Sequence, residues 1–153
     1  MLLIIVAYIL VGATLSTAEI VVTAQKDLTI LSEARLRTDL TIDPNDISIS
    51  GNGLNFSVTN TGNEKIADFA HLDIYTFDGT SDYQRQIYDK DTTHAAGTWA
   101  LMRIDNDYTN PSQIDPGERA WIMAVFTGSN PVFVQMTTHN GVTAQLTAPV
   151  EGW

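Results

Sequence analysis

Residues 1–18 decide the organisation of this 153-residue chain, because they read MLLIIVAYILVGATLSTA and contain no charged side chain. As an α-helix, this stretch would be about 27 Å long, which is close to the hydrocarbon thickness of a lipid bilayer. A helix that is apolar on every side has to lie in lipid or be surrounded by protein. The sequence therefore predicts an N-terminal helix whose surface is covered by something other than water.

The next residues, 19–37, continue the helix. They contain neither glycine nor proline, and their apolar side chains recur close to helical spacing, at Ile20, Val21, Ala24, Leu28, Leu31 and Leu36. Glu33 and Arg37 form an i,i+4 pair in the favoured order. We expect one helix from near residue 2 to near residue 37, about 50 Å long at the standard rise.

Three interpretations of the apolar stretch remain open. It could be a secretory signal peptide cleaved after Ser16-Thr17-Ala18, although the first basic residue is Lys26, beyond the apolar stretch. It could be a permanent membrane anchor, or a helix that waits in the membrane and later lies in the core of a polymer. A signal peptide does not normally continue into a charged helical stalk, which favours the second and third interpretations.

Glu19 is the first charge after the apolar stretch. In a bilayer or a dry protein core a carboxylate needs a partner, and Glu19 would then set the register between neighbouring copies. The simpler interpretation, which the sequence favours, is that Glu19 lies at the interface where the helix leaves the apolar layer.

Charge separates the helix from the rest of the chain. In residues 1–37, Lys26, Arg35 and Arg37 balance Glu19, Asp27 and Glu33, so the whole formal net charge of −10 belongs to residues 38–153. An acidic surface repels phosphate backbones, so we expect no nucleic-acid partner. The chain contains no cysteine, which excludes disulfides and thiolate metal sites.

The pattern after residue 38 is that of short β-strands. Apolar and polar side chains alternate with period two, and turn signals such as Asp115-Pro116-Gly117 separate the runs. The expected strands are 47–50, 54–59, 71–77, 83–88, 99–104, 120–126, 132–137 and 142–146. The sequence predicts an α+β fold: a long apolar N-terminal α-helix (1–38) followed by an immunoglobulin-like antiparallel β-sandwich (39–153).

No pattern in the chain indicates catalysis. His71, His94 and His139 have no metal-ligand spacing, and no G-x-S-x-G motif or glycine-rich phosphate loop occurs. We therefore expect no catalytic residue and no cofactor. The acidic loops 78–82, 89–91 and 105–107 could hold a structural Ca²⁺ or Mg²⁺ ion, but solvated turn residues are the favoured interpretation.

Two surface features point to carbohydrate. Asn55-Phe56-Ser57 is an N-glycosylation sequon, and strand alternation with Leu54, Phe56 and Val58 inward would place Asn55 outward. Exposed aromatic residues could stack on sugars, and the candidates are Trp99, Trp121, Tyr83, Tyr88 and Tyr108. A sugar-binding module or an enzyme would require them to gather on one open face.

Taken together, the apolar start Leu2-Leu3-Ile4-Ile5-Val6-Ala7-Tyr8-Ile9-Leu10-Val11-Gly12-Ala13-Thr14 and its continuation through residues 31–40 resemble archaellins, the filament proteins of the archaeal swimming organelle. They also resemble related accessory archaellum proteins that anchor a β-sandwich outside the membrane. The stretch Val58-Thr59-Asn60-Thr61-Gly62 and the turn Ile114-Asp115-Pro116-Gly117-Glu118 are similar to segments of that family.

The resemblance implies a type-IV-pilin-like assembly with no catalytic residue. Membrane-inserted precursors would be packed by an assembly ATPase and its platform machinery into an extracellular helical homopolymer used for swimming. The helices would form the core and the β-domains the outer surface, and small residues would permit close helix approach. The alternative is a stator-like accessory protein or minor pilin that does not polymerise. The expected core-packing positions are Leu2, Leu3, Ile5, Val6, Ile9, Leu10, Gly12, Ala13, Leu15, Ile20, Ala24, Leu28 and Leu31.

Overall fold

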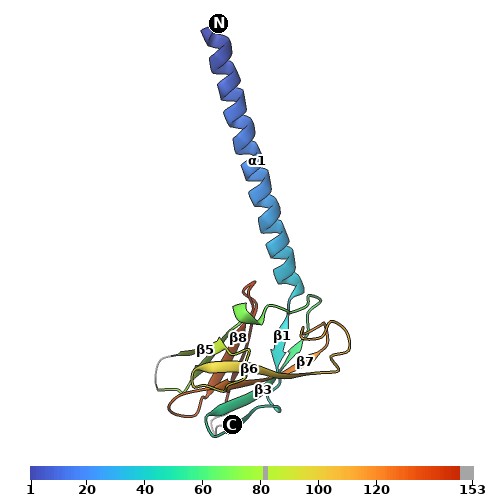
Figure 1. Ribbon diagram of the computed structural model, residues 1–153, viewed down its shortest axis with the longest axis vertical. Coiled ribbons are helices and arrows are strands. Elements are labelled where there is room, and N and C mark those ends of the chain that lie inside the picture. The colour runs from blue at the N-terminus through green and yellow to red at the C-terminus, as the bar shows by residue number, and fades with distance from the viewer. Residues whose placement is uncertain (81–82, 149–153) are drawn as a thin grey trace. The chain divides into compact units, whose positions relative to one another are not determined.

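A computed structural model describes residues 1–80 and 83–148 of the chain (Figure 1). The helix α1 spans Leu2–Arg37, as the sequence predicts. The chain divides into two compact units, residues 1–34 and residues 35–153. The last turn of α1 therefore belongs to the same unit as the strands.

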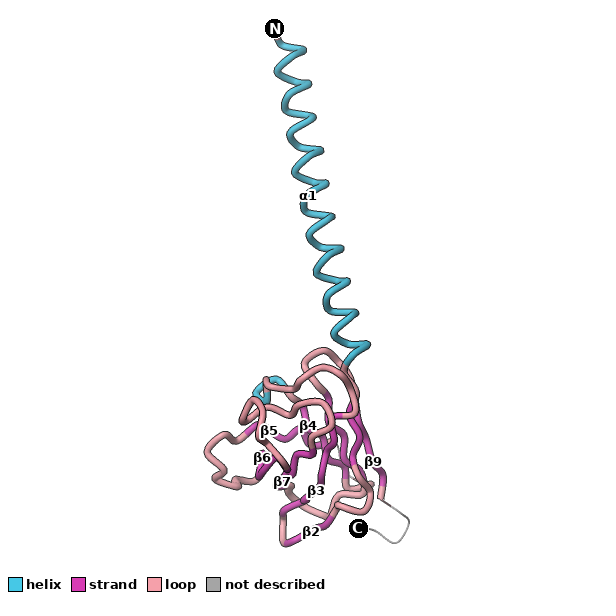
Figure 2. Tube along the Cα trace, turned by 90° about the vertical axis from the view of Figure 1, so that its right-hand side faces the viewer, coloured by secondary structure: helices cyan, strands magenta, loops and turns pink. Residues whose placement is uncertain are grey.

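The second unit is built from strands joined by turns (Figure 2). A short 3₁₀ helix, η1 (Phe69–His71), precedes the fourth strand. The strands are β1 (Leu40–Ile42), β2 (Ser48–Ser50), β3 (Gly53–Asn60), β4 (Asp73–Phe77), β5 (Gln84–Tyr88), β6 (Thr98–Asp105), β7 (Arg119–Val125), β8 (Phe133–Thr137) and β9 (Thr143–Thr147).

The strands follow one continuous hydrogen-bonded order, β1-β3-β7-β6-β5-β4-β8-β9, and β2 pairs with β3 beside this path. The two ends of the order, β1 and β9, also lie in contact, so the sheet rolls into a sandwich-like, barrel-like domain. Among the described strands, every pairing is antiparallel except that of β5 with β6, which is parallel and joins Ile87 to Thr98 and Tyr88 to Trp99. The predicted α+β fold class is confirmed, with this one mixed pairing.

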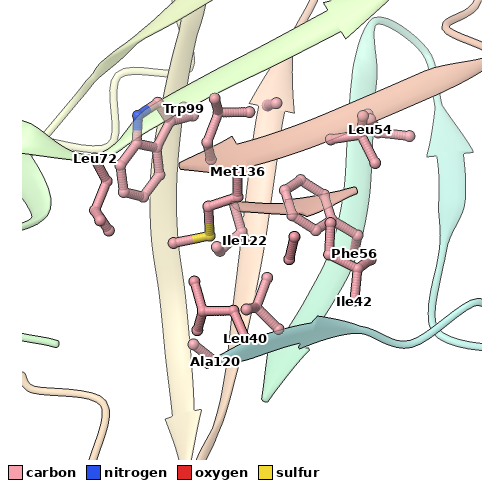
Figure 3. Packing of buried hydrophobic residues seen from close by; sticks show 14 of the residues in the cluster. Leu40, Ile42, Leu54, Phe56, Leu72, Trp99, Ala120, Ile122 and Met136 are labelled. Atoms are coloured by element: carbon pink, nitrogen blue, oxygen red, sulfur yellow. The ribbon is translucent and has the colours of Figure 1, made fainter. Parts of the chain in front are cut away.

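The inward faces of the strands share one apolar core (Figure 3). Leu54, Phe56 and Val58 alternate along β3 and are fully buried, as their spacing predicts. Phe56 is paired in register with Ile122 of β7, and Trp99 of β6 is buried beside Ala124. The core is completed by side chains from the other strands and loops, including Leu40, Ile42, Leu72, Ile74, Ala120, Val134 and Met136.

Strand β1 was not predicted, because it is only three residues long and directly follows the helix. Its alternation becomes visible only in the folded domain, where Leu40 and Ile42 are buried and Thr41 between them is exposed. Leu40 and Ile42 pair with Asn60 and Val58 of β3. The chain thus enters the core soon after the helix has ended.

Asn60, at the end of β3, is a fully buried polar residue that holds two loops together. Its side-chain Nδ2 donates to the carbonyl oxygens of Glu64 (2.8 Å) and Ile114 (2.9 Å), and its Oδ1 accepts from the N–H of Gly62 (3.1 Å). Backbone bonds from Asn60 N–H to Glu118 and from Gly117 N–H to Asn60 complete its pairing. The resemblance to archaellins drew on these same segments, 58–62 and 114–118.

Replacing Asn60 by alanine is expected to lower the free energy of unfolding by about 1–3 kcal/mol, because three hydrogen bonds between its fully buried amide and the backbone are lost. Asn63→Ala, an identical change at an exposed residue of the same loop, is the matched control. Chemical denaturation of the full chain in detergent, followed by tryptophan fluorescence, measures both variants. Equal loss of stability in the two variants would contradict this role of Asn60.

Candidate assembly surfaces

The surface of α1 exposes many apolar side chains. All its described side chains from residue 3 to residue 33 are exposed, among them Leu3, Ile4, Ile5, Val6, Leu10, Val11, Ile20, Leu28 and Leu31. By length and composition the helix can cross a membrane. An 18-residue segment of it has a mean hydropathy of 2.0, and none of that segment is buried within the chain. Leu2, Ile9, Ala13 and Leu15 of the predicted packing set have side chains outside the described part.

The end of α1 is bound by the loop that follows β3. The carbonyl oxygen of Arg37 accepts hydrogen bonds from the N–H groups of Asn63 (2.7 Å) and Glu64 (3.2 Å), so this carbonyl at the helix end is satisfied. The Arg37 guanidinium lies 3.7 Å from the Glu64 carboxylate. A Cβ atom at Gly62 would collide with the backbone of residues 37–39, so the close approach requires glycine there.

A shallow hollow of about 350 Å³ lies on the outer side of β3, β6 and β7. Trp121 lines it, where its indole Nε1–H donates to Asp105 (2.8 Å) and the Arg103 guanidinium lies 4.7 Å from the ring centroid. Met102, the extra residue of a β-bulge between Leu101 and Arg103, borders it. The hollow therefore offers an indole and a thioether side chain bordered by a guanidinium and a carboxylate.

Asn55 lines the same hollow and is partly exposed, with Met123 of β7 and Ser48 of β2 as its register partners. Ser57, the third residue of the sequon, is fully buried, and its Oγ–H donates to Asp46 (2.8 Å). Asp46 also binds Arg119 (2.8 Å). Since strands lie on both sides of Asn55, a glycosylating enzyme would have to reach the sequon before β3 pairs with its neighbours. Glycosylation at Asn55 stays a prediction.

Asp89 organises the loop that makes the parallel β5–β6 pairing feasible. Its Oδ2 accepts from the N–H and Oγ of Thr93 (both 2.6 Å) and from the N–H of His94 (3.1 Å), and its Oδ1 accepts from Asp91 N–H (3.1 Å). Thr92 and His94 adopt left-handed backbone conformations. The carboxylate thus binds its own loop, which turns the chain through residues 89–97.

These hydrogen bonds, first that from the Thr93 hydroxyl, hold the pKa of Asp89 below its ordinary value of 3.8. Because the pKa is lower in the folded state, the ionised Asp89 carboxylate contributes its full stabilisation of the fold above pH 3.8. This stabilisation is lost as the pH falls through the folded-state pKa. We expect the amide NMR shifts of Thr93 and His94 in the full chain to titrate with a midpoint below pH 3.8. A midpoint at or above that pH would contradict the assignment.

The aromatic residues do not gather on one open face. Trp99 is buried in the core with Tyr88 packed against it, at a centroid distance of 4.7 Å. Trp121 lies on the outer side of the neighbouring strand, whereas Tyr83 stacks on Phe77 at 4.6 Å. This arrangement gives no support to a sugar-binding face built from all five candidates.

The titratable residues in the described ranges form no metal-ligand cluster. Within residues 1–80 and 83–148, no three histidine or acidic side chains lie together as metal ligands. His71 bonds to Asp68 (2.7 Å), and Asp78 accepts from Thr80 N–H (2.9 Å). Asp82, in one of the predicted acidic loops, lies outside the described residues. A structural Ca²⁺ or Mg²⁺ ion stays a prediction.

Comparison with solved structures finds a similar fold in archaellum proteins. The archaeal flagellum of Methanospirillum hungatei matches with a TM-score of 0.62 over 98% of this chain and 88% of that chain, at 16% identity. The archaellum periplasmic stator protein FlaG from Sulfolobus acidocaldarius matches with a TM-score of 0.51 over 71% and 97%, at 19% identity. The complex of FlaF and FlaG from that organism matches with a TM-score of 0.50 over 70% and 85%, at 18% identity.

The resemblance to archaellum proteins is thus confirmed in the fold. By sequence, the chain is 28% identical to an uncharacterised protein of Archaeoglobus fulgidus over 133 residues, which covers 84% of this chain and 76% of that protein. No protein-family model matches the chain.

Proposed function

We propose that the chain is a non-enzymatic subunit of an archaellum-type, type-IV-pilin-like filament. The observation that carries the proposal is the long helix, whose described apolar side chains are exposed within its own chain. Such a surface has to be covered by lipid or by other helices. Covering the uncharged stretch 1–18 contributes on the order of tens of kcal/mol gross, at about 25 cal/mol per Å² of apolar surface.

In this proposal the precursor waits in the membrane, and an assembly ATPase with its platform machinery moves it into a helical homopolymer outside the cell. The helices form the core, and the acidic β-domains face outward and keep the filament soluble. The likeness to the Methanospirillum hungatei flagellum supports this proposal, because it extends over 98% of the chain and so includes the helix. Helical operators generate open polymers through heterologous contacts.

The second candidate is a membrane-anchored, stator-like accessory protein that does not polymerise. The likeness to FlaG favours it, because that match covers 97% of the stator protein. In this case α1 stays in the bilayer, and the β-domain presents a partner surface outside the membrane. The hollow lined by Trp121 is the surface that we would assign to that partner.

Shearing separates the two candidates. Surface filaments are sheared from cells that make the chain, and both the sheared material and the membranes are quantified by mass spectrometry. A strain without the gene is the control. The filament proposal predicts that this chain is a major polypeptide of the sheared filaments. Filaments that lack the chain, with the chain confined to membranes, would contradict it and favour the anchored accessory protein.

A further inference from the structure

Three charges recur at a fixed interval along α1. Glu19, Lys26 and Glu33 are each seven residues apart, and their signs alternate. Because α1 is continuous through all three, each step of seven turns the stripe by only about 20° and advances it by about 10.5 Å. The three side chains therefore form one charged stripe on one face of the helix, and all three are exposed.

This stripe selects one register between parallel copies of the helix. With no axial displacement, every charge of the stripe would face the same charge on its neighbour. With a displacement of seven residues, Glu19 of one copy lies level with Lys26 of the next, and Lys26 of the first lies level with Glu33. A displacement of fourteen residues would bring Glu19 opposite Glu33, which is again repulsive.

We propose that the Glu19–Lys26–Glu33 stripe docks against the stripe of a second copy of this chain and fixes an axial displacement of about 10 Å between neighbouring helices. The occupant is a second copy because the stripe complements itself only when displaced by seven residues. Parallel helices meet through identical stripes when these turn toward a common axis, as the seams of parallel coiled coils do. The inference rests on the proposed filament function and adds its register.

The pairing also explains how charges are tolerated next to the apolar stretch. A charge enclosed by packed helices is costly unless it is paired. In the displaced register Glu19 and Lys26 each have a partner of opposite sign. The repulsion in the undisplaced register disfavours the competing arrangement, as in other interfaces whose specificity depends on charge.

Two charge reversals test the proposal, with the yield of sheared filaments as the readout. Lys26→Glu makes both pairs repulsive, and Glu19→Lys makes one pair repulsive, so filament yield should fall by at least about tenfold for Lys26→Glu and less for Glu19→Lys. Gln25→Glu adds a charge at the same depth on another face of the helix and should leave the yield near that of the wild type. Immunoblots of the membrane fraction confirm that each variant accumulates.

Co-expression of the two variants distinguishes contacts between chains from contacts within one chain. In an alternating contact, the lysine that replaces Glu19 in one variant faces the glutamate that replaces Lys26 in the other. The unchanged Glu19 of the second variant faces the unchanged Lys26 of the first, so most pairs in the mixture are attractive. Mixed filaments should therefore form in higher yield than from either variant alone.

Failure of the mixture to recover, or normal filaments from Lys26→Glu alone, would overturn the proposed register. If wild-type cells make no filaments of this chain, the proposed function itself has failed. The two failures are therefore distinguishable in one set of strains.

Cysteine cross-linking gives a second readout, which is specific because the natural chain contains no cysteine. Thr23 and Ile30 are also seven residues apart and flank the stripe. Filaments of Thr23→Cys/Ile30→Cys should oxidise to a ladder of covalent oligomers, because the facing cysteines come within disulfide reach. Each single variant carries one cysteine and should stay monomeric, and covalent dimers from Thr23→Cys alone would indicate an undisplaced register and overturn the proposal.

Discussion

Replacing Leu10 by arginine is expected to abolish filaments and to reduce insertion of the chain into the membrane. Leu10 is an exposed side chain near the middle of the uncharged stretch. An arginine at the centre of a membrane-spanning helix costs about 2.5–3.5 kcal/mol of insertion free energy. In a packed core of helices the same charge would be buried without a partner, which is also unfavourable. Every subunit carries the defect, so a polymer repeats the cost at each copy.

The matched control is Leu36→Arg, the same substitution in the charged last turn of the helix. Leu36 is exposed and lies between Arg35 and Arg37, so one more arginine meets water and leaves the apolar stretch intact. Electron microscopy of sheared material and quantification of membrane protein measure both variants. Normal filaments from Leu10→Arg would show that the apolar half of α1 is not enclosed, which contradicts the account.

Phe56→Ala is expected to have the largest effect on the β-domain, with a loss of about 3–5 kcal/mol in the free energy of unfolding. Phe56 is fully buried in the middle of β3, against Ile122 of β7 and the residues around it (Figure 3). Truncation removes apolar contact and leaves a cavity that the paired strands on both sides cannot close.

Tyr108→Ala is the control for this prediction, because Tyr108 is 87% exposed and lies outside the strands. Urea denaturation of the full chain in detergent should show a lower midpoint for Phe56→Ala and an unchanged one for Tyr108→Ala. Equal midpoints for Phe56→Ala and the wild type would mean that β3 is not the centre of the core.

The helix was the most predictable part of the fold. An uncharged stretch followed by residues at helical spacing, without proline, fixes both the type and the extent of α1, which ends at Arg37 as expected. The longer strands were predictable for a similar reason. Leu54, Phe56 and Val58 alternate with polar residues because the two faces of β3 meet different environments, and this contrast is visible in the sequence.

Other features depend on contacts between distant residues and carry no local signal. Strand β1 has three residues, too few for a pattern to stand out, and its burial depends on β3 and β9. The parallel pairing of β5 with β6 joins Ile87 to Thr98 and Tyr88 to Trp99, and the residue pattern of the two strands does not indicate this direction. The bulge that exposes Met102 beside Trp121 is likewise set by the register with β7.

The assembly surface was predictable in part. The apolar composition of residues 1–18 shows that this part of the helix has to be shielded from water, but composition does not tell whether lipid or protein shields it. Glu19 alone fits a membrane interface. Its spacing from Lys26 and Glu33 becomes meaningful once α1 runs unbroken through all three residues, because only then do they share one face.

Electron cryo-microscopy of sheared filaments from cells that make this chain tests the central claim most directly. The account predicts filaments whose density fits this sequence, with α1 packed among neighbouring helices in the core and the β-domain outside. Filaments whose density fits another polypeptide, together with recovery of this chain only from membranes, would contradict the account and assign α1 to the bilayer.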